Sequence, residues 1–236
     1  MEMKGMIKGT ITDLKSAINN MFENDNASNR PEIVRQQEHF DRFGNMMIDV
    51  ETLSTRTNAS IIEIAAVEFN KLSGEIGDTF DILIKPSEWG CNGRDADGRT
   101  VLWWMNQSVE AKKRYNGDEN NMSSLHNALC DLTLFVKNHD NTDKQSGKSV
   151  VVWGNGATMD ITILQSAYEH FHMETPWKYW AVNDCRTIVD IMPEIKKYTP
   201  FEGVKHSAMD DCKHQIKYVS KTLHAINLSI KNLKFG

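Results

Sequence analysis

The sequence predicts an α/β protein built on a mixed β-sheet, with helices on both faces of the sheet. Three strand-like segments follow one another between residues 43 and 85, and from residue 101 onward helical patterns alternate with short apolar segments. Antiparallel strands followed by alternating helices and strands are typical of such a sheet. The composition agrees, because 236 residues with 40% hydrophobic and 25% charged side chains can build a large globular core.

The predicted sheet opens with three consecutive antiparallel strands. Phe43–Val50 is short and apolar, and Ser60–Phe69 has the hydrophobic character of a buried strand. Glu75–Lys85 alternates apolar and polar residues like a third strand, and Asn70–Gly74 before it has the composition of a hairpin turn. We therefore expect a three-stranded meander at the start of the domain.

The second half alternates helices with short strands. Residues 91–100 and 141–148 are rich in turn formers or polar residues and are expected to be loops. Short strands are predicted at Ser149–Trp153 and Tyr179–Val182. Apolar residues at helical spacing predict helices over Val101–Tyr115, Ser123–His139, Met159–His172, Thr187–Met192 and Ser207–Ala225. Glu194–Lys205, which contains Pro200 and Gly203, is expected to be a mobile loop.

Residues 1–38 differ from the rest and are expected to form an extension to a single domain over residues 39–236. Apolar residues recur at helical spacing and predict a short helix over Thr10–Phe22, followed by a linker of turn formers at residues 24–31. The extension is either a docking or lid element or a mobile tail.

Charge and composition exclude several classes of protein. The 27 basic and 32 acidic residues give a net charge of -5, which excludes a histone-like protein that coats nucleic acid by bulk charge. No apolar run approaches the ~20 residues that span a bilayer, and the first residues lack the apolar stretch of a signal peptide. The cysteines lie too far apart for a disulfide framework or zinc ribbon, so we expect a cytoplasmic protein. They are Cys91, Cys130, Cys185 and Cys212.

Five residues stand out at the ends of predicted strands and the starts of predicted helices. Asp49 and Glu51 end the first strand on one face; either they emerge into solvent or they bind something positive. Asp160 opens the helix after the fourth strand, where the helix dipole alone also favours an acid. Asp211 follows His206 by five residues, so the two either face one pocket or form a simple charge cluster at a helix start.

The four acids Asp49, Glu51, Asp160 and Asp211 are expected to meet at one point. Two like charges about 4 Å apart repel by about 4 kcal/mol at an effective dielectric of about 20, so four such groups either raise their pKa values or bind cations. Oxygen ligands favour hard ions such as Mg²⁺ or Mn²⁺ over Zn²⁺. Two such ions about 3.5–4 Å apart hydrolyse phosphodiester bonds. The acids therefore predict a two-metal phosphodiesterase site.

The order of these residues resembles the DEDD superfamily of 3′→5′ exonucleases, which have a ribonuclease H-like fold. Asp-x-Glu, a later Asp and His-x4-Asp match the subgroup whose fifth residue is histidine, because the tyrosine subgroup needs Tyr at Ser207. Over about residues 43–225 the chain is similar to phage and prophage single-strand exonucleases and small bacterial exoribonucleases. The matching segments are Met47–Leu53, Thr100–Ser108, Val152–Gly156, Pro176–Trp180, Arg186–Thr187 and Lys205–Asp211.

The resemblance implies a role for each of these residues. Asp49 would bridge two divalent ions, Mg²⁺ or Mn²⁺, and Glu51, Asp160 and Asp211 would complete their shells. His206 would be the general base that takes a proton from the attacking water, for which its unperturbed pKa of about 6.5 is suited. Movement of the preceding loop would bring His206 into place only when a 3′ end is seated.

The resemblance also implies contacts to the bound strand. Leu53 would be an apolar wedge against the terminal base, or an ordinary partly buried leucine. Trp103 and Trp104 would be a stacking platform or core residues, and Gln107, one turn later, would bond a base or sugar edge. Arg186 would bind phosphate, or pair with a neighbouring aspartate. Thr52 and Asn155 lie in matching segments and complete the predicted contacts.

These observations together predict a metal-dependent 3′→5′ exonuclease that releases 5′-mononucleotides from single-stranded nucleic acid, DNA slightly ahead of RNA. The alternative is a non-catalytic ribonuclease H-like module that binds nucleic acid; such modules typically lose one or more of the acids, and here all five positions are filled. An endonuclease of this fold is disfavoured by the His-x4-Asp element, and a zinc hydrolase by the type of ligand. No membrane partner is expected, and the oligomeric state is left open.

Overall fold

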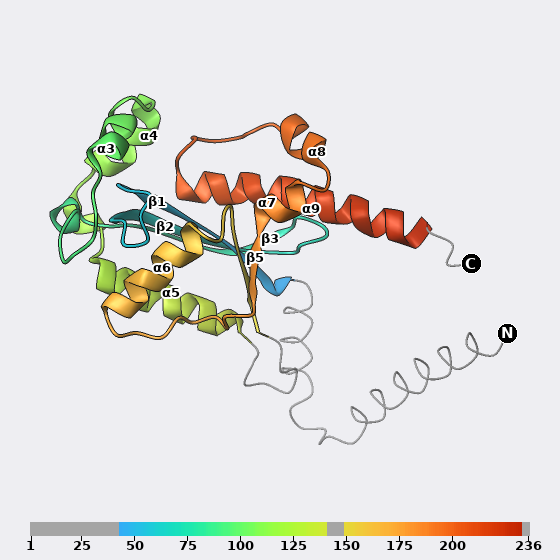
Figure 1. The fold of residues 1–236 in the computed structure, drawn as a ribbon, viewed down its shortest axis with the longest axis horizontal. Coiled ribbons are helices and arrows are strands. Elements are labelled where there is room, and N and C mark those ends of the chain that lie inside the picture. Colours follow the sequence, from blue (N-terminus) through green and yellow to red (C-terminus); the bar gives the residue numbers. More distant parts are fainter. Residues whose placement is uncertain (1–42, 141–148, 233–236) are drawn as a thin grey trace, which may run out of the picture. The chain divides into compact units, whose positions relative to one another are not determined.

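The computed structural model describes residues 43–140 and 149–232, with side chains up to residue 229 (Figure 1). The predicted extension with its helix at Thr10–Phe22, and the predicted loop at 141–148, lie outside the described residues. In the described part of the chain, no helix is both long and apolar enough to cross a lipid bilayer.

The described residues contain a five-stranded mixed sheet, which confirms the predicted fold class. The strands are β1 (Asn45–Thr52), β2 (Ile61–Phe69), β3 (Ile76–Leu83), β4 (Val151–Gly154) and β5 (Val182–Asp184). Their order is β3-β2-β1-β4-β5; the first three pair antiparallel, and β4 runs parallel to both β1 and β5. The predicted hairpin turn joins β2 to β3, where the Asn70 amide donates to the Glu75 carbonyl over 2.8 Å.

Helices cover both faces of this sheet (Figure 1). On one face, α5 (Leu125–His139) and α6 (Asp160–His170) pack their apolar sides on β1 and β2 and form the larger core. On the other face, α7 (Cys185–Val189) and the long α9 (Ala208–Asn232) form a second core. Every residue of β2 is buried because the strand is covered on both sides. The sheet is therefore a rigid layer that holds the residues at its edge.

The predicted helix over Val101–Tyr115 is broken in the structure. It forms α3 (Gly98–Met105), α4 (Val109–Lys113) and a 3₁₀ turn at Arg114–Asn116. The break occurs because Ser108 is an N-cap, its Oγ accepting a hydrogen bond from the Ala111 amide over 3.1 Å. Two further 3₁₀ turns lie at Pro86–Glu88 and Glu119–Asn121.

Four other predicted segments also differ from the structure. The first part of the expected loop at Glu194–Lys205 is helical, because Pro193 begins α8 (Pro193–Tyr198) with a backbone already suited to a first helical turn. The strand expected at Tyr179–Val182 is β5, and the helix expected at Thr187–Met192 is α7, which begins at Cys185. The last helix continues past Ala225 to Asn232.

Candidate active site

The predicted acids come from three elements that end or begin at one edge of the sheet. Asp49 and Glu51 lie near the end of β1, and Asp160 is the first residue of α6, which follows the parallel strand β4. Asp211 lies in the first turn of α9. Because parallel strands end at the same edge, β1 and β4 deliver their acids to one place.

Electrostatic interactions show that all four carboxylates meet. Burial raises the pKa of Asp49 well above its usual range, and the charges of Asp160, Glu51 and Asp211 raise it further. Burial likewise raises the pKa of Glu51, and the charges of Asp211, Glu63 and Asp160 raise it further. The exposed fractions of Asp49 and Asp160 are only 9% and 6%. The four carboxylates therefore lie close enough to repel one another, and the cluster that they form is partly buried.

Backbone amides and one guanidinium partly stabilise the charge of Asp160. Burial raises its pKa to about 7, while hydrogen bonds from the amides of Val50 and Asn155 and the charge of Arg186 lower it. Burial also raises the pKa of Asp211 to about 6. Both groups therefore titrate close to neutrality, where a cation would compete with protons for them.

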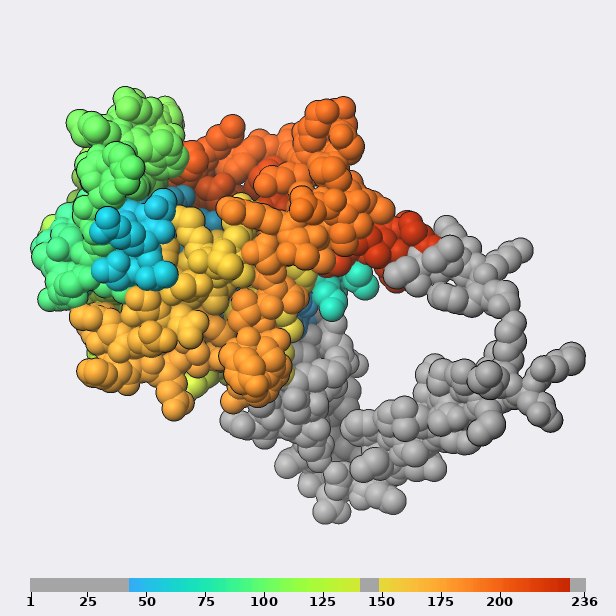
Figure 2. Space-filling view, viewed as in Figure 1, coloured from blue at the N-terminus to red at the C-terminus, as the bar shows by residue number. Residues whose placement is uncertain are grey.

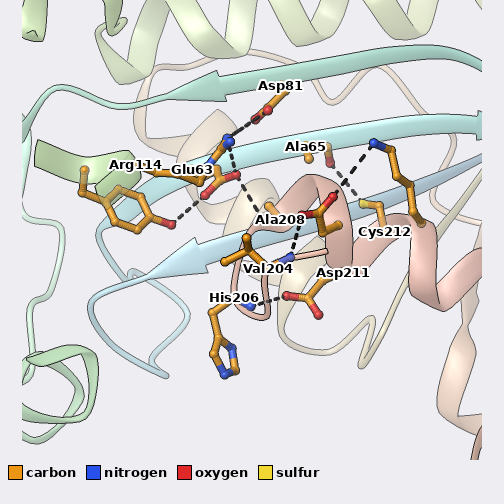
Figure 3. Close-up of polar contacts among 12 residues, drawn as sticks. Glu63, Ala65, Asp81, Arg114, Val204, His206, Ala208, Asp211 and Cys212 are labelled. Carbon is orange, nitrogen blue, oxygen red and sulfur yellow. Dashed lines mark hydrogen bonds and ion pairs between the residues drawn. The ribbon is translucent and has the colours of Figure 1, made fainter. Parts of the chain in front are cut away.

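His206 stands in the turn directly before α9. Its backbone is in the left-handed region at φ 65°, which a non-glycine residue adopts at a cost of about 1–3 kcal/mol. The Asp211 Oδ2 accepts a hydrogen bond from the His206 amide over 2.8 Å, and the Asp210 Oδ2 accepts one from the Val204 amide over 2.9 Å (Figure 3). These two hydrogen bonds tie the segment that carries the His206 imidazole to the start of α9. The movement expected of the loop before His206 remains a prediction.

The donor set fits hard divalent cations. Glu51, His206 and Asp211 each offer one ligand atom, and these atoms all lie within 4.8 Å of one another. Asp49 and Asp160 add further oxygen donors to the same cluster. A mostly carboxylate set with one histidine suits Mg²⁺ or Mn²⁺, and binding would offset the repulsion among the acids.

Gln215 belongs to the site, although the sequence analysis did not select it. It lies four residues after Asp211 on α9, is 3% exposed, and its Nε2 donates to the Asp49 Oδ1 over 2.7 Å. Four residues are about one helical turn, so both side chains point to the same edge of the sheet. This spacing after Asp211 is the sequence signal by which Gln215 could have been found. Through its hydrogen bond, Gln215 orients the Asp49 carboxylate, which the resemblance implies is shared by the two ions.

A groove of about 550 Å³ leads to the acids from the α3 side. In Figure 2, the green α3–α4 lobe, the blue segment after β1 and the yellow start of α6 lie next to one another on this face. Trp103 lines the groove with 44% of its surface exposed, and Glu51 and Thr52 form its inner end. The Thr52 hydroxyl is buried and donates to the Ser54 carbonyl over 2.7 Å.

The two adjacent tryptophans have different environments. Trp104 is 6% exposed, packs with Leu53 and Ile62, and donates its Nε1 hydrogen to the Thr52 carbonyl over 2.9 Å. Trp103 is exposed, and its ring centroid lies 4.7 Å from that of His206 in an edge-on contact. Trp104 is therefore a core residue, and direct contact with a base remains a prediction for Trp103 alone.

The other predicted contacts, apart from Thr52, are not among the residues that line this groove. Leu53 is 8% exposed and lines a neighbouring apolar pocket, so burial places it behind the groove with Trp104. Gln107 lies two residues beyond the end of α3, and its side chain donates to the Trp103 carbonyl over 3.0 Å. Asn155 lies in the turn between β4 and α6, and the Arg186 guanidinium lies over Gly156, where a Cβ would meet its Cζ at 2.9 Å. Glycine at 156 therefore lets Arg186 approach Asp160.

The family model for the Rv2179c-like 3′-5′ exoribonuclease domain matches residues 44–223. The exodeoxyribonuclease of Enterobacteria phage T4 is 24% identical over 203 residues, which cover 73% of this chain and 86% of the phage protein.

Two solved nuclease structures share the fold. Cell-death related nuclease 4 (CRN-4) is similar with a TM-score of 0.55 at 14% identity; the match covers 77% of this chain and 64%, less than two thirds, of CRN-4. The nuclease domain of 3′hExo, a DEDDh family member solved with bound rAMP, has a TM-score of 0.50 at 13% identity, covering 77% of this chain and 92% of that domain. These likenesses confirm the predicted ribonuclease H-like fold.

Proposed function

The chain belongs to the family of Rv2179c-like 3′-5′ exoribonuclease domains, and from this premise we propose that it removes nucleotides one at a time from the 3′ end of single-stranded nucleic acid. The observation that carries the proposal is the meeting of Asp49, Glu51, Asp160 and Asp211 beside His206. Buried acids that repel one another destabilise a fold, and a cation-dependent reaction gives a reason for the arrangement.

We propose that Asp49, Glu51, Asp160 and Asp211 would hold two divalent ions, Mg²⁺ or Mn²⁺. Bound there, such ions would activate a water molecule and stabilise the leaving oxygen of the phosphodiester. Gln215 would keep the Asp49 carboxylate in its rotamer, since it donates to Oδ1. Arg186, whose charge lowers the pKa of Asp160, would neutralise phosphate.

His206 is the proposed general base. Burial and the neighbouring Lys205 lower its pKa, so the imidazole is neutral at pH 7 and can accept a proton from water. The water oxygen then forms a bond to phosphorus, the bond to the 3′ oxygen of the preceding nucleotide breaks, and the released nucleotide keeps a 5′ phosphate. Trp103, exposed along the groove, would stack on the unpaired terminal base.

DNA is the proposed substrate ahead of RNA. The T4 relative is an exodeoxyribonuclease that aligns over 86% of its own length, whereas the family description names an exoribonuclease. One contact to a 2′-hydroxyl separates the two substrates.

Residues 1–38 are proposed as an extension outside the catalytic domain, and the four free cysteines fit a reducing cytoplasm.

The test is degradation of 3′- and 5′-labelled single strands of DNA and RNA, and of duplexes with recessed or overhanging 3′ ends. We expect mononucleotides from the 3′ end with Mg²⁺ or Mn²⁺ and none with EDTA. Binding without any metal-dependent release would instead favour the non-catalytic module, and internal fragments would favour an endonuclease. Either result would remove the exonuclease proposal.

A further inference from the structure

A buried carboxylate that is neither a proposed metal ligand nor the proposed base lies directly beside the active site, and its charge acts on Glu51. Glu63 is on β2, opposite Glu51 in the antiparallel pairing of β1 and β2, and its side chain has no exposed surface. A buried charge is costly unless hydrogen bonds and an opposite charge compensate it. The partners of Glu63 therefore show what the residue holds in place.

These partners come from two segments that are distant in sequence (Figure 3). From the 3₁₀ turn after α4, the Arg114 Nη2 donates to Glu63 Oε1 over 2.8 Å and the Tyr115 hydroxyl donates to Oε2 over 2.6 Å. From the first residue of α9, the Ala208 amide donates to Oε1 over 3.1 Å. The same Arg114 nitrogen also pairs with Asp81 on β3, which ties it to the sheet.

Each of these two segments carries one wall of the active site. The α3–α4 segment carries both tryptophans, and the Tyr115 ring packs edge-on against Trp104 with centroids 5.3 Å apart. The α9 segment carries His206, two residues before Ala208. The His206 ring then contacts Trp103 at 4.7 Å and Trp104 at 6.2 Å between centroids.

These contacts therefore form a closed ring. It runs from Glu63 through Tyr115 and the tryptophans to His206, and returns through Ala208 to Glu63. His206 needs such support, because its left-handed backbone is held only if its surroundings compensate the strain. Among the residues of this ring of contacts, Glu63 is the one that accepts hydrogen bonds from both segments and lies on a strand of the central sheet.

We propose that Glu63 is a positioning residue, which holds the imidazole of His206 against the Trp103 platform by tying the α3–α4 segment to the start of α9. The inference rests on the proposed function, in which that imidazole accepts the proton from water and that platform stacks on the terminal base. Glu63 thereby sets the distance between the seated 3′ end and the base. It acts through His206 and touches no substrate itself.

The first test is a double-mutant cycle with Glu63→Gln and His206→Ala. A misplacement of about 1 Å costs up to about 100-fold in rate, so we expect Glu63→Gln to lower kcat per folded molecule by about 10- to 100-fold. In the His206→Ala background the same change should cost less than about twofold, since the residue it positions is already gone. The proposal would be overturned if Glu63→Gln lowered kcat by the same factor in the His206→Ala background as in wild type. It would also be overturned if Glu63→Gln alone left kcat within about twofold of wild type.

Two further variants separate positioning from folding. Tyr115→Phe keeps the ring against Trp104 and removes only the hydroxyl, so it should fold even if Glu63→Gln does not, and lower kcat in the same direction. The matched control is Glu68→Gln, which alters another buried carboxylate of β2, at the end next to Asp78 and His139. It should leave kcat per folded molecule unchanged. An equal loss of kcat in the control would show a merely structural effect.

A readout independent of turnover uses ¹⁹F NMR on protein labelled with 5-fluorotryptophan. The chain has six tryptophans, and the Trp103→Phe variant identifies the Trp103 signal. We expect His206→Ala and Glu63→Gln each to shift that signal, and Glu68→Gln to leave it in place. An unshifted Trp103 signal in Glu63→Gln would refute the proposal. If the wild type showed no metal-dependent release, the proposed function would fail, and this signal would still decide whether Glu63 positions His206.

Discussion

Neutralising one of the converging acids should stabilise the metal-free protein while removing its ability to bind metal. The pKa of Asp160 is about 7 in the folded protein and 3.8 without the fold, so the unfolded chain ionises at lower pH than the native one. Such a group carries no penalty below pH 3.8 and its full penalty above pH 7. The shift corresponds to about 4 kcal/mol of lost stability at pH 8.

Asp160→Asn removes this penalty and keeps the shape of the side chain. We subtract about 1 kcal/mol, because an amide accepts the hydrogen bonds of the Val50 and Asn155 amides less well than a carboxylate. In EDTA at pH 8 the variant should therefore be about 3 kcal/mol more stable than wild type. This gain should shrink to about 1 kcal/mol at pH 5, where Asp160 of the native protein is already protonated.

The assay is urea unfolding of both proteins at pH 5 and pH 8, with and without Mg²⁺. With metal at 100 times its dissociation constant, wild type should gain about 2.7 kcal/mol and Asp160→Asn far less. Asp131→Asn on the exposed side of α5 is the matched control and should change stability by less than about 0.5 kcal/mol at either pH. A difference between Asp160→Asn and wild type that is the same at pH 5 and pH 8 would refute the reasoning, as would equal stabilisation of both by Mg²⁺.

Four further substitutions test single side chains in the site or packed behind it. His206→Ala should lower the rate of nucleotide release by at least about 100-fold with metal binding retained in calorimetry, and wild-type turnover would remove the assigned base. Gln215→Met should weaken metal binding by about 10- to 100-fold, because Asp49 loses the donor that orients it; an unchanged affinity would contradict that role. Trp103→Ala should weaken oligonucleotide binding by about 1–3 kcal/mol with little change in melting temperature. Trp104→Ala should instead cost about 3–5 kcal/mol of folding stability, and a reversed pattern would exchange the roles of the two rings.

The fold class and the five residues that meet in the site could be predicted from the sequence because their signals are local. The period of a strand places Asp49 and Glu51 on one face, and the position of Asp160 after β4 needs only the rule that parallel strands end at one edge. The spacing from His206 to Asp211 is a short-range feature of a helix start. Such patterns can be recognised in the sequence without knowing which elements pack together.

The partners of these residues could not be predicted, because packing alone decides them. Nothing near Glu63 in the sequence indicates that Arg114, Tyr115 and Ala208 converge on it, since these contacts span 51 to 145 residues. Local patterns also do not show which of Trp103 and Trp104 faces the groove, because both belong to one short helix and the burial of its sides depends on the sheet beneath. The sequence thus determined the chemistry of the site, whereas the tertiary structure decided which side chains hold that chemistry in place, because long-range contacts form only when the elements pack.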